Sequence, residues 1–315
     1  RKSGCCAAGN AANGRTDTAA HIKVCRQSGL HIVGEVGHHT IDVFCHALGG
    51  FDRFRVPAAL LVIAIHTGPL LSLNGEANYL LTDILARIAV PFFFSVSGWF
   101  LVRRLPGRKP EGVRSAALLH HKENLTENKL LLLYGAAVLL YLPLNLYNHT
   151  LEESGFALLR DVLFNGTFYH LWYFPALVLG ACLVYGLLRI LGPRWAWLPA
   201  LLLYAAGLLG DSYFGLTAAL PPLRAGYEAL FLLFDYTRNG LFFPPVFLLL
   251  GGWLALRPAR RSAAWYGAGL LLSLALLTAE GLLVQRLALA RFDALYLSLP
   301  LCVGFLLRWL QRLSL

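Results

Sequence analysis

The chain repeats one feature that decides its structural class: apolar segments of about 20 residues, each bounded by polar or basic positions. We predict eight of them, at approximately residues 54–73, 84–102, 129–147, 168–190, 195–210, 239–256, 263–284 and 293–309. A helix of that length crosses the hydrocarbon core of a bilayer with every backbone group satisfied. Only 14% of the residues are charged, against about 25% in soluble domains. The sequence therefore predicts an all-α, polytopic transmembrane helical bundle whose first partner is the lipid bilayer.

Residues 1–50 differ from the rest of the chain, because they are rich in Gly, Ala, His and Cys and follow no helical or strand period. The His and Cys spacings match no standard zinc pattern, so we predict no metal site. We expect a poorly ordered or non-native N-terminal tail at 1–50 and one membrane domain at 51–315. The chain contains no Met and begins at Arg1, which favours an incomplete reading frame.

The basic residues predict how the chain lies in the membrane. Cytoplasmic loops of membrane proteins carry an excess of Lys and Arg, and the loop after residue 102 alone holds seven basic residues: Arg103, Arg104, Arg108, Lys109, Arg114, Lys122 and Lys129. The opposite loops hold Arg87, Arg160, Arg224, Arg238, Arg286 and Arg291. This alternation predicts a multi-pass protein of the cell inner (cytoplasmic) membrane with a cytoplasmic N-terminus. We attribute the formal net charge of +10 to the orientation of the chain in the membrane, and we expect no nucleic-acid partner.

Two polar residues in the first apolar segment stand out by their spacing. Arg55 and His66 are 11 positions apart, which places them within about 20° of the same helix face and about 16 Å apart along its axis. Arg55 would lie at the cytoplasmic interface and His66 deep in the hydrocarbon, where a polar group is costly. Alone, Arg55 is typical of an interfacial anchor and His66 of a residue that hydrogen-bonds another helix.

Together, the two residue types indicate chemistry. A guanidinium binds phosphate bidentately, and histidine is the side chain best suited to proton transfer near neutral pH. Acyl-coenzyme A carries phosphates at one end and a thioester at the end of a long arm, which fits the 16 Å spacing (about three helical turns). The sequence predicts acyl transfer with acyl-CoA as co-substrate, Arg55 at the phosphates and His66 as general base, with no bound cofactor.

The first segment resembles the Arg-x10-His signature of the acyltransferase family 3 membrane proteins. The stretches PFFFSVSGWFL at 91–101 and HLWYFPAL at 170–177 agree with that family. LLVIAIHTGPL, YLPLNLYN, GLLGDSYFG and FDYTRNGLFFPPVFLLLG are most similar to the membrane domain of vancomycin-resistance-type membrane-bound serine racemases. The likeness covers approximately residues 51–310.

The resemblance implies about ten spans and transfer of an acyl group, expected to be acetyl, from cytoplasmic acyl-CoA to a hydroxyl of an extracytoplasmic glycan or cell-wall acceptor. It implies that Arg55 and His66 are the functional pair, and that His170, Trp172 and Tyr173 lie near the acceptor. Eight spans instead of ten indicate a C-terminal truncation. No racemase domain follows, so racemase activity is not assigned to this chain.

Other residues have two interpretations each. Trp172 and Tyr173 are also typical of an interfacial aromatic belt. Asp235 and Arg238, spaced i,i+3, predict an outer-surface ion pair or a site for an acceptor or amino acid. Ser95, Ser97 and Gly98 favour close helix packing, with a lining of a substrate path as the alternative. Glu280 favours an interfacial position. Two other functions stay open: a transporter-like domain that supplies L-serine across the membrane, through His66, Asp235 and Arg238, and a membrane anchor.

Overall fold

In the computed structural model, residues 38–104, 160–166 and 171–313 are described, together with isolated helical positions between 132 and 147. These residues form helices and loops, with no β-strand among them. The all-α prediction is thereby confirmed for the described ranges. The predicted segment 129–147 lies largely outside them, as do residues 1–37. The domain boundary at residue 51 stays a prediction, and the first described helix already begins at His38.

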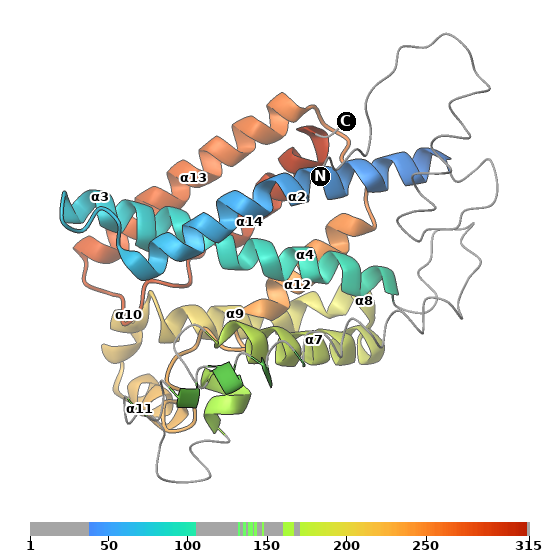
Figure 1. Cartoon of the computed structure of the whole chain (residues 1–315). Helices are drawn as coiled ribbons and strands as arrows, with labels where there is room; N and C mark the ends of the chain where they lie inside the picture. The colour runs from blue at the N-terminus through green and yellow to red at the C-terminus, as the bar shows by residue number, and fades with distance from the viewer. Residues whose placement is uncertain are drawn as a thin grey trace, which may run out of the picture.

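Figure 1 shows the described helices labelled and coloured in chain order. Their bounds are α2 His38–Thr67, α3 Gly75–Tyr79, α4 Ala89–Arg104, α7 Tyr173–Ile190, α8 Gly192–Trp195, α9 Trp197–Gly210, α10 Phe214–Ala218, α11 Pro221–Leu230, α12 Pro244–Ala255, α13 Ala263–Arg286 and α14 Leu299–Leu313. A π-helix, Leu80–Ile84, and a 3-10 helix, Leu85–Ile88, join α3 to α4, and a second π-helix covers Asp161–Asn165.

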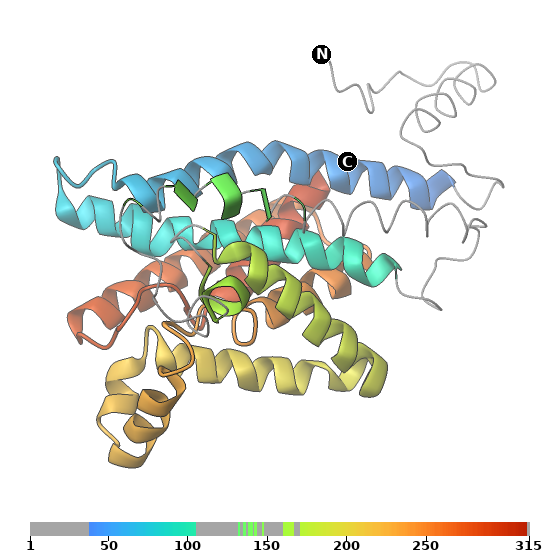
Figure 2. The same cartoon turned by 60° about the horizontal axis from the view of Figure 1, so that its bottom comes forward.

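The first two long helical segments form an antiparallel hairpin, visible in both views (Figures 1 and 2). Helix α2 ends at Thr67 because Gly68 takes φ +53°, the left-handed conformation that commonly stops a helix, and Pro69 follows. The turn is fixed by Asn78, whose side-chain oxygen accepts a hydrogen bond from the backbone N–H of Leu70 at 3.2 Å. Helix α2 therefore ends at Thr67, six residues before the predicted end of the segment 54–73.

Helices α4 and α12 make the closest contact in the structure. A Cβ atom added at Gly98 would collide with the backbone of Leu248, and one added at Gly251 would collide with the backbone of Ser95. Small residues let helices in a membrane approach this closely and gain van der Waals contact. The predicted packing role of the Ser95–Gly98 stretch is confirmed, and α12 sits at the centre, also in contact with α7, α9 and α14.

Three described helical stretches are long and apolar enough to cross a membrane: Gly75–Val102, Tyr173–Ile190 and Ala263–Arg286. Helix α13 keeps large apolar side chains on its outer face, with Leu271 70% and Leu272 74% exposed. A contiguous apolar face of this kind suits contact with lipid. The count of eight spans stays a prediction, since α12 is a shorter apolar helix.

The stretch predicted as an outer loop, 211–237, contains the two short helices α10 and α11, which lie together at one corner of the molecule (Figure 2). The last helix differs from prediction. We expected it to start at residue 293, and α14 begins at Leu299 with Pro300 in its first turn. Proline is favoured there because its missing N–H needs no partner.

Two carboxylates hold the non-helical stretch 291–298 in place. Asp211 Oδ1 accepts hydrogen bonds from the backbone N–H groups of Ala294, at 2.8 Å, and Leu295, at 2.9 Å. Glu280 accepts hydrogen bonds from the backbone N–H and hydroxyl of Ser298 and from the hydroxyl of Tyr213. The interpretation of Glu280 as an interfacial residue was incomplete, because its carboxylate organises the chain before α14. These bonds place Ala294 where a pocket forms.

Burial raises the pKa of Asp211 from 3.8 to about 6, although its backbone and Ser212 hydrogen bonds and the charge of Arg238 act in the opposite direction. The folded protein therefore binds a proton between about pH 4 and pH 6 that the unfolded chain does not hold. Stability is greatest at the acid end of this window and falls as pH rises through the folded pKa, by roughly 3 kcal/mol in total.

We predict that Asp211→Asn removes this part of the pH dependence. An Asn oxygen accepts the same backbone hydrogen bonds but does not titrate. Chemical unfolding followed by circular dichroism from pH 4 to pH 7 measures the effect. The wild type should lose stability over that range more steeply than the variant. Equal slopes would show that Asp211 does not titrate there.

Candidate functional site

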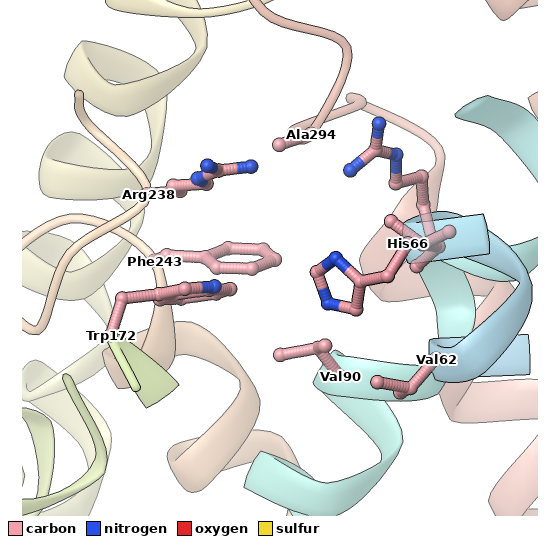
Figure 3. Close-up of a pocket in the computed structure, with 9 residues that line it drawn as sticks. Val62, His66, Val90, Trp172, Arg238, Phe243 and Ala294 are labelled. Carbon is pink, nitrogen blue, oxygen red and sulfur yellow. The ribbon is translucent and has the colours of Figure 1, made fainter. Parts of the chain in front are cut away.

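One pocket brings together residues from distant parts of the chain. It encloses about 410 Å³ of space, part of which opens to the surroundings. Its described lining consists of Val62, Ile65, His66, Arg87, Val90, Trp172, Arg238, Phe243 and Ala294. Figure 3 shows His66 on one side facing Trp172 and Phe243 on the other, with Arg238 beside the Phe243 ring. Three of the predicted site residues therefore share this pocket: His66, Trp172 and Arg238.

The helical register of α2 brings His66 to this position. Phe51 and Ala58 are buried on the same side of α2, and the Phe51 ring packs edge-on against Phe92 of α4, with ring centroids 6.4 Å apart. Val62 and His66 continue that stripe at the four-residue spacing of a helix face. As a result, the apolar contact between α2 and α4 sets the direction of the imidazole near the end of α2. The His66 residue is itself exposed.

Arg238 is a buried cation held by aromatic rings. Only 7% of the residue is exposed, and its guanidinium carbon lies 4.5 Å from the ring centroid of Tyr236 and 5.5 Å from that of Trp172. Cation–π contact of this kind is strongest where water is excluded. The Trp172 ring itself stacks on Phe243, with centroids 6.2 Å apart and an interplanar angle of 23°. Rigid aromatic neighbours therefore fix Arg238 at the pocket.

Arg87 is a pocket residue that the sequence analysis missed. It comes from the 3-10 helix Leu85–Ile88, has 14% of its side chain exposed, and donates to Asp83 at 2.5 Å. We assigned it to an outer loop, although it falls inside the predicted segment 84–102. A charged side chain within an apolar segment is itself a signal of function. The π-to-3-10 irregularity beside it is a second one, since such interruptions of helices are frequent at functional sites.

Other predicted residues lie elsewhere. Arg55 does not line the pocket; its side chain is 49% exposed and pairs with Asp52 at 2.7 Å. Tyr173 packs on the ring of Phe94, with centroids 5.0 Å apart. The Asp235 side chain is half exposed, lies 3.8 Å from Arg160 and is not among the described lining residues of the pocket. His170 lies outside the described residues.

The polar side chains that line the pocket are mostly basic. Its described lining includes two guanidinium groups and an imidazole, and no carboxylate. Such a site can attract an anion and take up a proton. Across the described ranges, no group of three or more His, Cys, Asp or Glu side chains is placed to hold a metal ion. The His and Cys residues of the N-terminal region lie outside those ranges or have undescribed side chains.

Comparison with known proteins agrees with this organisation. A family profile described as "Acyltransferase domain" matches residues 48–314. An amino-acid racemase of Enterococcus faecalis is 42% identical over 213 residues, 67% of this chain and 28% of the relative. A second from the same species is 37% identical over 281 residues, 85% of this chain and 38% of the relative. A serine/alanine racemase of Enterococcus gallinarum is 39% identical over 270 residues, 82% of this chain and 37% of the relative.

The chain thus spans less than two fifths of the length of these curated relatives. No solved structure matches it. The family profile runs from within α2 to the end of α14, and the described lining of the pocket that contains His66 lies entirely within the matched residues. The chain belongs to the acyltransferase family 3 of membrane-embedded proteins.

Proposed function

We propose that this chain is a membrane-bound O-acyltransferase, which moves an acyl group, acetyl in the simplest case, from cytoplasmic acyl-CoA to a hydroxyl of an extracytoplasmic glycan or cell-wall acceptor. The observation that carries the proposal is the position of His66 in a pocket with Arg87 and Arg238. Membership of the acyltransferase family supports the reaction class. The proposed location is the inner membrane, with the N-terminus in the cytoplasm.

In the proposed reaction, His66 accepts the proton of the acceptor hydroxyl while that oxygen attacks the thioester carbonyl and a C–O bond forms. Negative charge develops on the carbonyl oxygen and is favoured by the basic pocket, because preorganised positive groups stabilise such charge more than water does. The C–S bond then breaks, and the CoA thiolate leaves with the proton from the His66 imidazolium. The products are an ester and free CoA thiol.

A second candidate function follows from the relatives. They are named amino-acid racemase and serine/alanine racemase, and a pocket with two guanidinium groups can bind the carboxylate of an amino acid. Under this alternative, the chain supplies L-serine across the bilayer as a transporter-like domain. His66 and Arg238 would then lie on the path of the amino acid, as polar residues do in transporters.

One experiment separates the two functions. The purified chain in lipid nanodiscs is mixed with acetyl-CoA and a candidate acceptor, and free CoA thiol is measured; the same chain in sealed vesicles is tested for uptake of labelled L-serine. Thiol release that depends on His66 supports acyl transfer. Serine uptake without thiol release would replace this proposal by the transport function. If His66→Ala changed neither signal, a membrane anchor would be the better description.

We predict that Arg55→Ala acts on donor binding. Arg55 lies near the start of the apolar part of α2, where the proposal places the CoA phosphates, and away from the pocket. Loss of a charge-assisted contact to phosphate should raise the Kd for acetyl-CoA at least about tenfold. Isothermal titration measures this, with Arg53→Ala as the neighbouring exposed control. Unchanged acetyl-CoA binding in Arg55→Ala would remove Arg55 from the donor site.

A further inference from the structure

The pocket holds two guanidinium groups, which is more positive charge than the one carbonyl oxygen that becomes negative in acyl transfer requires. Arg87 and Arg238 come from different parts of the chain, one from the 3-10 helix before α4 and the other from the loop before α12, and both line the same space. Only 14% of the Arg87 side chain and 7% of Arg238 are exposed. Two poorly hydrated cations that face one cavity favour an anion in it.

Two carboxylates lie near these cations without belonging to the described lining of the cavity. Asp83 pairs with one terminal nitrogen of Arg87, Nη2. The positive charge of Arg238 acts to lower the pKa of Asp211, which burial raises. Asp211 Oδ1 itself accepts hydrogen bonds from the backbone N–H groups of residues 294 and 295. The described lining of the cavity therefore presents two guanidinium groups with no acidic side chain among them.

Geometry also limits which anion fits. The proposed donor has its phosphates near Arg55, about 16 Å from His66 along the helix, so its nucleotide end lies away from this pocket. A carboxylate matches the planar fork of a guanidinium. His66 faces the side of the pocket on which Arg238 and Phe243 lie (Figure 3). A compound whose carboxylate binds Arg238 and Arg87 therefore occupies the same pocket as the imidazole.

We propose that the pocket selects an acceptor that carries a carboxylate close to the hydroxyl that is acylated, and that Arg87 and Arg238 are its specificity-determining residues. This inference rests on the proposed function, because it names the chemical class of the acceptor. Two sources share the required chemistry: an acidic sugar of a glycan and a hydroxyl-bearing amino acid. In both, the arginines bind the carboxylate and His66 receives the hydroxyl proton.

The test uses matched probes that differ only in the carboxylate. Binding to the full chain in nanodiscs is measured by isothermal titration for D-glucuronate against D-glucuronamide, and for L-serine against L-serinamide. We expect the wild type to bind one acid at least about tenfold more tightly than its amide, the effect of losing a charge-assisted hydrogen bond. The preferred pair identifies the source as a sugar or an amino acid.

Variants of the two arginines test whether these residues cause the preference for the acid over its amide. Arg238→Gln and Arg87→Gln should bring the acid-to-amide ratio close to one, and Arg238→Lys should give an intermediate ratio because it keeps the charge but loses the fork. Arg224→Gln is the control, since Arg224 lies on α11, pairs with Glu228 and does not line the pocket. It should keep the wild-type ratio. Size-exclusion profiles identify any variant that fails to fold, and Arg238→Lys then carries the test.

Several results would overturn the inference. Equal binding of acid and amide by the wild type, or binding of neither, would do so even if CoA release proceeds, in which case the proposed acyl transfer still stands. If Arg238→Gln instead loses binding of adenosine 3′,5′-bisphosphate, the arginines hold the donor. If the carboxylate preference holds but no acceptor gives CoA release, the acyl-transfer proposal fails and the carboxylate site remains.

Discussion

Replacing His66 with Ala is expected to lower acetyl-CoA-dependent thiol release by about 10²–10⁴-fold, the usual contribution of a general base. Binding of acetyl-CoA should stay within a fewfold of the wild type, because the proposal places the donor's phosphates near Arg55. The reason is positional: His66 is the imidazole that α2 places in the pocket. Release of CoA thiol under saturating donor, measured beside titration of acetyl-CoA, separates the two effects.

Two controls make this result specific. Thr67→Ala changes the next residue of α2, whose hydroxyl donates only to the backbone carbonyl of Ile63 at 3.0 Å, and it should leave turnover nearly unchanged. The double variant His66→Ala with Ala64→His keeps a histidine on the helix but rotates it about 200° around the axis. It should be as inactive as His66→Ala. Activity in that double variant would mean that the position of the imidazole is unimportant.

Gly251→Val is expected to produce the largest loss of stability. A Cβ at Gly251 meets the backbone of Ser95, which cannot move aside as a flexible side chain can. The helices α4 and α12 would have to separate, and α12 also contacts α7, α9 and α14. Overpacking against backbone in this setting should cost about 3 kcal/mol or more. Unfolding in mixed detergent and SDS, followed by circular dichroism, measures the change.

Gly186→Ala is the matched control for this prediction. Gly186 is also inside a helix, α7, but a Cβ there meets no atom within 4 Å. Alanine costs less backbone entropy than glycine in a helix, so the variant should be neutral or more stable by about 0.5 kcal/mol. If Gly251→Val unfolded at the same SDS fraction as Gly186→Ala, the close approach of α4 and α12 would not be a source of stability.

The apolar pattern of the sequence predicts the long helices well. The segments predicted at 168–190 and 263–284 correspond to α7, Tyr173–Ile190, and α13, Ala263–Arg286. Local residues also explain where α2 stops, since Gly68 and Pro69 follow its last turn. The end of such a helix depends on residues next to it in the chain, so it can be predicted from the sequence alone.

The parts that the sequence did not predict depend on distant partners. Helix α14 begins six residues later than expected because two carboxylates bind backbone N–H groups of the preceding stretch. Asp211, after the end of α9, accepts from residues 294 and 295, and Glu280, from α13, accepts from residues 297 and 298. The same applies to Arg238, which lies in the pocket because the rings of Trp172 and Tyr236 hold it there. Spacing to Asp235 along the chain contained no information about those rings.

The wide separation of the pocket residues along the chain has a consequence for folding. The lining runs from Val62 on α2 to Ala294 before α14, so the site depends on contacts between the first and last described helices. Contacts of such long sequence separation form slowly, because a large loop must close before they contribute. The helices can therefore insert one by one during synthesis while the site does not yet exist. A substitution that delays the docking of α14 should lower the fraction of active molecules in a preparation and leave the turnover of each active molecule unchanged.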